Sequence, residues 1–297
     1  MKKFTALLGL LLLGFRGYGE NKAAIAATVS WDKMEIRASV SLDLGAGDTS
    51  VGFSPSGRIM AEETLRDEYP RLIRPSILSL PVDSSDTLAD LIKRGDFSLP
   101  RTDVFSAAAR RFPPAFSPDF SSMSAAYTLN LTRLSAALIR HRTAGDIARP
   151  LRPVPAAAYT GIIILAYENL PAHGRNTSAL VLPCLFPKIW DTEMNLIYER
   201  NMLDPQAAEK VTMVRYAPPE SVFRPSPSGV DPALAELVGE NPLRILARGV
   251  FGSRPTDPII DREDALLILS SEQNREHLRQ GRVAIILSSD TLLYKFQ

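Results

Sequence analysis

The sequence predicts an α+β protein with two small domains, each built on a mixed or antiparallel sheet, behind a signal peptide. Residues 1–19 have the layout of a secretory signal. Short strand-like runs alternate with helical patterns in both halves of the chain. Prolines cluster at 149–155, where they favour a stiff linker. We therefore expect a signal peptide at 1–19, an α+β domain at 20–148, a linker at 149–155 and a second α+β domain at 156–297.

The signal peptide is predicted from three adjoining features. Lys2 and Lys3 form a basic start, residues 4–15 are a leucine-rich apolar run, and Gly17 and Gly19 supply small residues before a cleavage after Gly19. The run is too short for a membrane span, which needs about 20 apolar residues. No cysteine follows it for lipid attachment, so we expect a periplasmic protein whose membrane association is only indirect.

Composition narrows the function classes. Removal of residues 1–19 changes the formal net charge from +1 to −2, which argues against a nucleic-acid or polybasic membrane binder. Hydrophobic residues make up 45% of the chain, as in a soluble globular protein.

The N-terminal half predicts a strand, helices and a returning strand. Apolar residues alternate with polar ones over 36–44, which is typical of a half-buried strand. A helical pattern covers 54–74, where Pro70 should start a new segment or introduce a kink. Ser84 or Ser85 is expected to cap a short helix over 88–92 that Gly95 ends, and alternation predicts a strand over 126–134.

The C-terminal half predicts a second α+β domain. Asp261 is expected to cap its last helix, with Asp264 as a capping-box partner. Prolines in 218–232 indicate an exposed loop. The predicted strands are 158–167, 180–189, 194–198, 211–216, 243–251 and 282–287, and the predicted helices are 205–210, 231–238 and 261–269.

No set of residues predicts a catalytic, cofactor or metal site. The single cysteine, Cys184, lies in an apolar run and is interpreted as a buried core residue; the alternative is an intermolecular disulfide or a reactive thiol. His141, His173 and His277 lack the spacing of metal ligands. We expect each of them to be a surface or core residue.

Three further patterns have a structural and a functional interpretation. The stretch 43–50 resembles the phosphate loop of actin-like and sugar-kinase ATPases, but no second phosphate motif follows and a polar turn is expected. Glu62 with Glu63, and the charged run 261–264, are interpreted as solvated helix residues, not as an acid/base pair or a cation site. Trp31 and Trp190, with Tyr127, Tyr159, Tyr167 and Tyr198, either pack in the core or form an interaction surface.

A resemblance covers most of the second half. Tyr159-Thr160-Gly161 before an apolar strand, Asn241-Pro242-Leu243, Thr256-Asp257 and Arg282-Val283 are arranged as in a recurrent bacterial envelope domain. Residues 20–148 resemble in pattern the LPP-type lipoprotein domain that often precedes it. The chain is thus similar to flagellar-collar and outer-membrane-associated proteins of the FlgP and FlgT kind. The resemblance implies a non-enzymatic scaffold without a cofactor, often assembled as rings.

The expected function is that of a non-enzymatic periplasmic structural or assembly protein of the cell envelope, at the flagellar basal body if the resemblance extends that far. Its expected partners are envelope or flagellar-motor proteins and further copies of itself. One alternative is a periplasmic module that binds a small ligand or polysaccharide in the cleft between its domains. A divergent hydrolase is a third hypothesis, for which no nucleophile or metal set is apparent.

Overall fold

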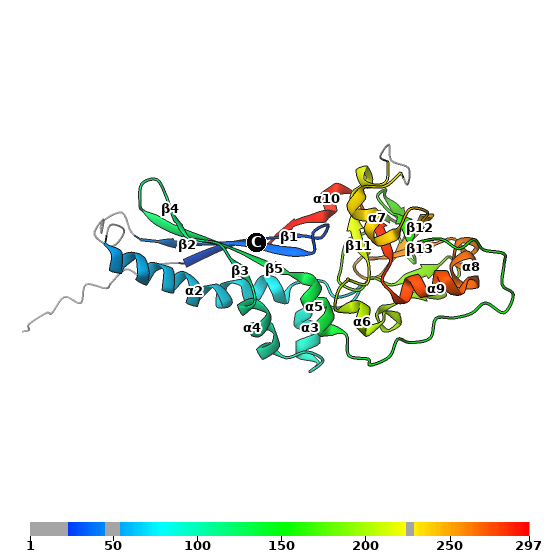
Figure 1. Ribbon diagram of the computed structural model, residues 1–297, viewed down its shortest axis with the longest axis horizontal. Helices are drawn as coiled ribbons and strands as arrows, with labels where there is room; N and C mark the ends of the chain where they lie inside the picture. The colour runs from blue at the N-terminus through cyan, green and yellow to red at the C-terminus, as the bar shows by residue number, and fades with distance from the viewer. Residues whose placement is uncertain (1–22, 45–53, 224–228, 297) are drawn as a thin grey trace, which may run out of the picture.

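The computed structural model describes residues 23–44, 54–223 and 229–296 as an α+β protein with two sheets (Figure 1). The predicted signal peptide at 1–19 and the glycines of the 43–50 stretch lie outside these residues. Within them, no helix has the length and apolar character that a membrane span requires.

The first sheet has the strand order β15-β1-β2-β5-β3, and β4 also pairs with β5. Every pairing in it is antiparallel, and β2 pairs with β1 and β5 along its whole length. On β2 every second residue is buried, which confirms the alternation expected over 36–44. The strands are β1 (Ala23–Ser30), β2 (Glu35–Asp43), β3 (Arg110–Arg111), β4 (Ala115–Phe116), β5 (Ser122–Asn130) and β15 (Leu293–Lys295).

One long helix, α2 (Pro55–Leu78), covers one face of this sheet (Figure 1). Pro70 was expected to start a new segment or to kink the helix; the new segment is wrong, because the helix continues through Pro70 and Pro75. A helix-interior proline costs about 3 kcal/mol. Here a buried stripe that includes Leu65 and Ile73 offsets that cost by packing on the sheet, where Tyr69 also stacks on Tyr127 at a centroid distance of 3.8 Å.

The rest of the first domain differs from the prediction at two caps. The short helix α3 (Leu88–Lys93) is capped by Thr87 with Asp90, not by Ser84 or Ser85. The strand expected over 126–134 ends at Asn130, whose side chain accepts a hydrogen bond from Thr132 N at 2.8 Å and starts α5 (Leu131–Leu138). The domain also contains α4 (Leu99–Ala107).

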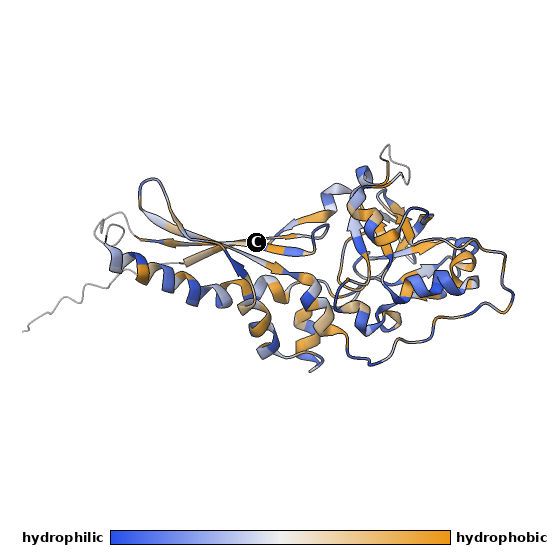
Figure 2. Ribbon diagram, viewed as in Figure 1, coloured by the Kyte–Doolittle hydropathy of each residue, from blue (hydrophilic) through white to orange (hydrophobic). Residues whose placement is uncertain are grey.

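The second sheet is mixed and has the order β10-β9-β13-β12-β6-β14-β11. Its central strands β6 and β14 run parallel and are apolar and nearly fully buried, as expected for strands covered on both faces, whereas the neighbouring parallel strand β12 alternates between buried and exposed residues (Figure 2). The strands are β6 (Ile162–Leu165), β9 (Ile189–Asp191), β10 (Leu196–Tyr198), β11 (Arg215–Ala217), β12 (Leu243–Phe251), β13 (Asp257–Ile260) and β14 (Val283–Ile286), and β7 (Leu170–Pro171) pairs with β8 (Ser178–Ala179).

Helices and short turns complete the second domain. The prediction missed α9, because its side chains are almost all polar and only Leu278 marks a buried apolar position. The elements are η1 (Arg200–Met202), α6 (Pro205–Ala208), η2 (Pro219–Ser221), α7 (Pro232–Val238), α8 (Arg262–Ser270), α9 (Glu272–Arg279) and α10 (Ser289–Leu292).

Two further expectations for the second domain are wrong. Residues 180–188 form a mostly buried segment without regular strand structure, since Pro183 and Pro187 have no N–H to give to a ladder. Asp261 does lie at the N-cap of α8, but its side chain makes no capping bond. It accepts a hydrogen bond from Arg248 Nε at 2.6 Å instead.

Two segments connect the halves of the molecule. The stretch 139–159 has no helix or strand and runs beside α8 and α9, where Val154 N donates to Ser270 Oγ at 3.0 Å. After α10 the chain leaves the second sheet, and β15 pairs with β1 of the first. The C-terminal strand is therefore an edge strand of the N-terminal sheet.

Candidate binding site at the domain junction

The segment that follows α2 is bound to the second domain by backbone hydrogen bonds. Leu185 N donates to Pro81 O at 3.1 Å, and Phe186 N donates to Val82 O at 2.8 Å. All four residues are largely buried, so the two domains share one continuous hydrophobic core at this point. The junction is therefore packed and hydrogen-bonded, unlike a flexible hinge.

Ser84 extends this contact into a tight turn of the second domain. Its carbonyl accepts hydrogen bonds from Arg254 N at 3.0 Å and from Ser253 Oγ at 2.6 Å. Gly252 has φ 116°, and a Cβ there would lie 2.5 Å from the Ser84 Cβ. Only glycine combines this backbone conformation with so close an approach.

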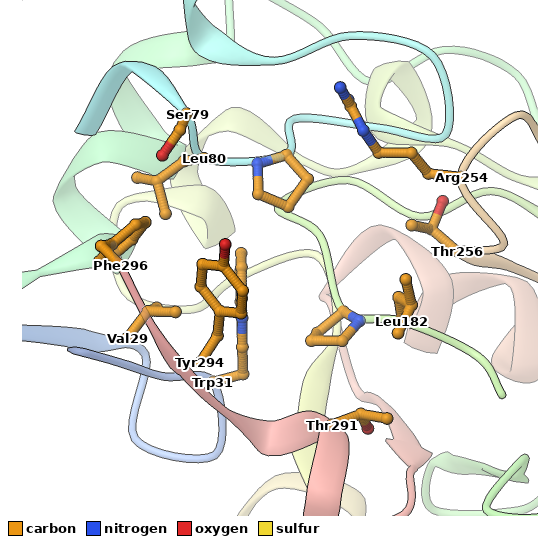
Figure 3. A pocket seen from close by; sticks show the side chains of 12 residues that line it. Val29, Trp31, Ser79, Leu80, Leu182, Arg254, Thr256, Thr291, Tyr294 and Phe296 are labelled. Carbon is orange, nitrogen blue, oxygen red and sulfur yellow. The ribbon is translucent and has the colours of Figure 1, made fainter. Parts of the chain in front are cut away.

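Beside this contact lies a cavity of about 270 Å³, which we call the junction cavity (Figure 3). Its walls come from β1, from the end of α2, from two loops of the second domain and from the C-terminal return. The lining residues are Val29, Trp31, Ser79, Leu80, Pro81, Leu182, Pro183, Arg254, Thr256, Thr291, Tyr294 and Phe296. Most of this wall is apolar.

Trp31 anchors the cavity wall. It is 2% exposed, its backbone N donates to Leu292 O at 2.9 Å, and its ring meets Tyr216 edge-on at 6.1 Å. Tyr294 on β15 is 56% exposed, so the cavity opens toward the C-terminal strand. The wall is therefore rigid on the Trp31 side and accessible on the Tyr294 side.

Arg254 supplies the unpaired polar group of the cavity. Its Nη1 is buried and has no hydrogen-bond partner among the described residues. The Thr256 hydroxyl is already used, since it donates to Asp257 Oδ1 at 2.9 Å. Arg254 is the only charged residue of the cavity lining, so the cavity suits a mainly apolar molecule.

Next to the cavity is a closed polar cluster around Asp257, which is fully buried. Besides Thr256, its carboxyl group accepts hydrogen bonds from Lys188 N at 3.2 Å and Trp190 Nε1 at 3.5 Å, and from the Ser84 hydroxyl of the first domain. Burial raises the pKa of Asp257, and these hydrogen bonds limit the rise. The carboxyl group holds the junction together and does not reach solvent.

Cys184 lies in the same closed region, as the core interpretation predicted. It is fully buried, and Tyr216 Oη accepts a hydrogen bond from its N at 3.1 Å and donates to its O at 2.9 Å. Burial raises the pKa of the Cys184 thiol far above its usual range. A thiol that stays protonated is a poor nucleophile, so the geometry gives Cys184 no catalytic role.

The three histidines are separated in the fold. Nε2 of His141 lies 2.7 Å from Leu203 O, Nε2 of His277 lies 2.8 Å from Tyr159 O, and His173 lies against Phe251. Burial lowers the pKa of His277. No group of three His, Cys, Asp or Glu residues suited to a metal ion occurs in the described part of the chain.

The acidic residues and aromatics do not form a site either. Glu62 pairs with Arg58 at 2.9 Å on the surface of α2. In the 261–264 run, Asp261 pairs with Arg248. Trp31, Tyr127 and Tyr198 are core residues, as the packing interpretation predicted, whereas Trp190, Tyr159 and Tyr167 are half-buried. Of the histidine, acidic and aromatic candidates, only Trp31 lines the junction cavity, together with Thr256 from the motifs of the family resemblance.

The motifs behind the family resemblance meet in the second domain and have structural roles. Thr160 Oγ1 donates to Val238 O at 2.7 Å and accepts from Asn241 N at 3.0 Å. At Gly161 a Cβ would lie 2.6 Å from the Val238 backbone. Arg282 Nε donates to Leu237 O at 2.9 Å. These residues fix the end of α7 against the sheet, which explains the pattern without a catalytic function.

The sequence did not predict Arg254 and Tyr294 as site residues, because neither lies in a motif and they are 40 positions apart. Pairing of β15 with β1 brings them to the same cavity. A signal in the sequence would have been the apolar C-terminal pattern Leu292, Tyr294 and Phe296, which has the period of a strand.

Each half of the chain is similar to a known family model. Residues 22–137 match the family model described as Treponema pallidum Tp0624, N-terminal domain, and residues 161–289 match that of Treponema pallidum Tp0624, second domain. No curated protein matches the chain. Neither description refers to a flagellar-collar protein, so that part of the resemblance stays a prediction. The chain is a two-domain α+β protein whose halves are similar, in the same order, to the N-terminal and second domains of Treponema pallidum Tp0624.

Proposed function

We propose that this chain is a non-enzymatic assembly protein of the bacterial cell envelope. The observation that carries the proposal is that reactive groups and accessible surface are separated at the domain junction. The titratable groups Asp257 and Cys184 are buried away from solvent, and the accessible cavity beside them has an apolar wall. A catalytic site needs reactive groups that reach the substrate. This arrangement instead stabilises the relation between two domains, as a scaffold requires.

The first sheet offers the surface for such a role. Its outer face, the side opposite α2, is open between the β4–β5 turn and α10 (Figure 1). A shallow hollow of about 590 Å³ on it is lined mostly by small residues, and its charged residues are Arg37, Arg110 and Glu35. Arg110, Thr128, Arg37, Thr28 and Lys295 are cross-strand neighbours in one row. Alternating cations in such a row favour a partner with an acidic surface.

The periplasmic location and the flagellar role belong to the same proposal. They are supported by the composition of residues 1–19 and by the resemblance to flagellar-collar proteins. The test is a crosslinked pull-down of the tagged full chain from native envelopes, read by mass spectrometry. We expect stable envelope proteins among the products, and basal-body components if the role is flagellar. Recovery of the bait alone would overturn the proposal.

A matched pair of variants makes the pull-down specific to the outer face. Arg37→Glu with Arg110→Glu reverses the charge of the row, and Arg66→Glu with Arg71→Glu makes the same net change on the exposed side of α2. We expect the first pair to lose the partner and the second to retain it. Equal recovery with both pairs would exclude the outer face as the contact.

The junction cavity favours a second candidate function, the binding of a small amphipathic ligand. Its volume of about 270 Å³, its apolar wall and the unpaired Arg254 Nη1 are the supporting observations. A suitable probe is 1-anilinonaphthalene-8-sulfonate, which combines an apolar body with one anion. We expect the folded protein to increase the fluorescence of the probe in a saturable way. The absence of such an increase would contradict this candidate function.

A further inference from the structure

The two edges of the first sheet are protected to very different degrees. At one edge, residues 110–116 pair with β5 and contain Arg110, Arg111, Pro113 and Pro114. Charges and prolines are the usual means by which proteins prevent unwanted strand pairing. The opposite edge is β1, and residues 23–30 contain no charge, proline or glycine.

The cover on the β1 edge is short. β15 pairs only with Thr28, Val29 and Ser30, and Phe296 N adds one bond to Ala27 O at 3.0 Å. Figure 1 shows the red C-terminal strand ending near the middle of the sheet. The half of β1 from Ala23 to Ala26 pairs with β2 on its inner side and has no described strand on its outer side.

The hydrogen bonds of β15 show which backbone groups are available. Because Phe296 N binds Ala27 O and Trp31 N binds Leu292 O, the odd-numbered residues of β1 direct their N–H and C=O groups toward this edge. Ala23 and Ile25 therefore present theirs on the uncovered half. Neither residue has a hydrogen bond on that side to another described residue. The uncovered edge is thus a template for one more strand.

The helix beneath this edge adds an apolar contact. Arg111 Nη2 of β3 donates to Glu62 O at 3.3 Å, which places the Glu62 flank of α2 under the β3 edge. Met60 lies about 200° around the helix from Glu62, because each residue turns the helix by about 100°. Met60 is thus on the β1 flank, where it is 68% exposed.

We propose that β1 pairs antiparallel with β1 of a second copy of this chain. The pairing joins two first sheets into one continuous sheet, and it places the two α2 helices side by side with their Met60 flanks facing. An uncharged strand can pair with itself without like-charge repulsion. An interface with two-fold symmetry uses the uncovered β1 edge of both copies and leaves neither free for a third, so the assembly closes as a dimer.

The bond pattern fixes the register. Edge-directed residues must face one another, so pairing Ala23 with the partner's Ile25 forms about four backbone hydrogen bonds across the two-fold axis. Ala24 then faces the partner's Ala24 as a non-hydrogen-bonded pair, with Cα atoms about 4.5 Å apart. This separation lies within the range that a disulfide spans.

Cysteine crosslinking of the full chain tests this register. Cys184 is buried, so an introduced cysteine is the reactive one. Under mild oxidation we expect Ala24→Cys to form a covalent dimer. Ser39→Cys is the matched control on the same face of β2. Its distance from its counterpart is at least three strand spacings, about 14 Å, too far for a disulfide. Crosslinking of Ala24→Cys no faster than that of Ser39→Cys would overturn the register.

Sedimentation equilibrium tests the dimer itself. We expect the wild type and Ile25→Val to dimerise as the protein concentration rises. Ile25→Pro should stay monomeric at protein concentrations at least tenfold higher, because it loses an edge-directed N–H without breaking the β1–β2 ladder. Ala24→Lys, which places like charges opposite each other across the two-fold axis and keeps every N–H of the edge, serves as a second variant should the proline unfold the strand. A wild type that stays monomeric throughout would overturn the dimer.

The dimer rests on the proposed assembly role, and the two fail separately. A monomeric chain that still recovers envelope proteins in the pull-down would overturn only the β1 pairing. A dimer that recovers no partner would overturn only the envelope-partner proposal.

Discussion

Two neighbouring residues at the domain junction have opposite surroundings. Thr256 lines the apolar junction cavity although it is buried and its hydroxyl donates to Asp257, whereas Asp257 lies wholly within the closed polar cluster. In the cluster every carboxyl contact is a hydrogen bond from a donor of the protein, while in the cavity Arg254 Nη1 has none. The difference separates the two roles: the cluster joins the domains, and the cavity is where another molecule can bind.

The largest effect is expected from Asp257→Ala. It leaves Lys188 N–H, Trp190 Nε1–H and the Thr256 hydroxyl without their acceptor in a buried place. Each unsatisfied buried donor costs about 1–3 kcal/mol, so we expect the free energy of unfolding to fall by about 3 kcal/mol or more in urea titrations. Asp261→Ala, whose partner Arg248 is exposed, is the control and should change it by about 0.5 kcal/mol or less. Equal effects would contradict a joining role for Asp257.

A large side chain placed in the cavity is expected to lower ligand affinity with little loss of protein stability. Leu182 is 39% exposed at its wall, so Leu182→Trp should occupy the space that the anilinonaphthalene probe needs. We expect at least a tenfold loss of probe affinity, which corresponds to about 1.4 kcal/mol. Leu246→Trp makes the same change at a similarly exposed position of β12, outside the cavity lining. If both variants bind the probe as the wild type does, the probe lies elsewhere.

Arg254→Met separates charge from shape in the cavity. It keeps much of the side-chain volume and removes the guanidinium, so binding of the anionic probe should weaken by about tenfold, or about 1.4 kcal/mol. N-phenyl-1-naphthylamine, which lacks the sulfonate, should bind both forms equally. Equal weakening of the two probes would mean that Arg254 acts by packing alone.

The pH dependence of stability tests the buried carboxyl group. Because burial raises the pKa of Asp257 above its unfolded value, the folded state binds this proton more tightly. Its contribution to stability is therefore present at acidic pH and is lost as pH rises through the folded pKa. As pH rises from the unfolded to the folded pKa, we expect the unfolding free energy of Asp257→Asn to increase relative to that of the wild type. The increase should be about 1.4 kcal/mol per unit of difference between the folded and unfolded pKa values of Asp257. A difference independent of pH would show that the carboxyl group titrates alike in both states.

The fold was predictable where burial follows a short period, and the candidate site was not. The strands at 36–44 and 243–251 show clean alternation and were confirmed. Pro70 misled, because its local cost is small beside the packing of a 24-residue helix. The cavity needs Val29, Leu182, Arg254 and Tyr294 together, and only the return of β15 to β1 makes them neighbours. Periodicity describes one segment at a time, so a site made of four segments lies beyond its reach.

The smallest effect is expected for the reactivity of the Cys184 thiol in the native protein. This reactivity tests whether the polar cluster is closed to solvent while the cavity is open. The thiol is buried and its pKa is raised, so it should react with a disulfide reagent only when the protein unfolds. Ala24→Cys, on the exposed face of β1, should react at once and provides the positive control. If the native protein releases one thiolate signal promptly, the cluster opens to solvent without unfolding. In that case Asp257 would also be accessible, and the distinction between a closed junction and an open cavity would have to be abandoned.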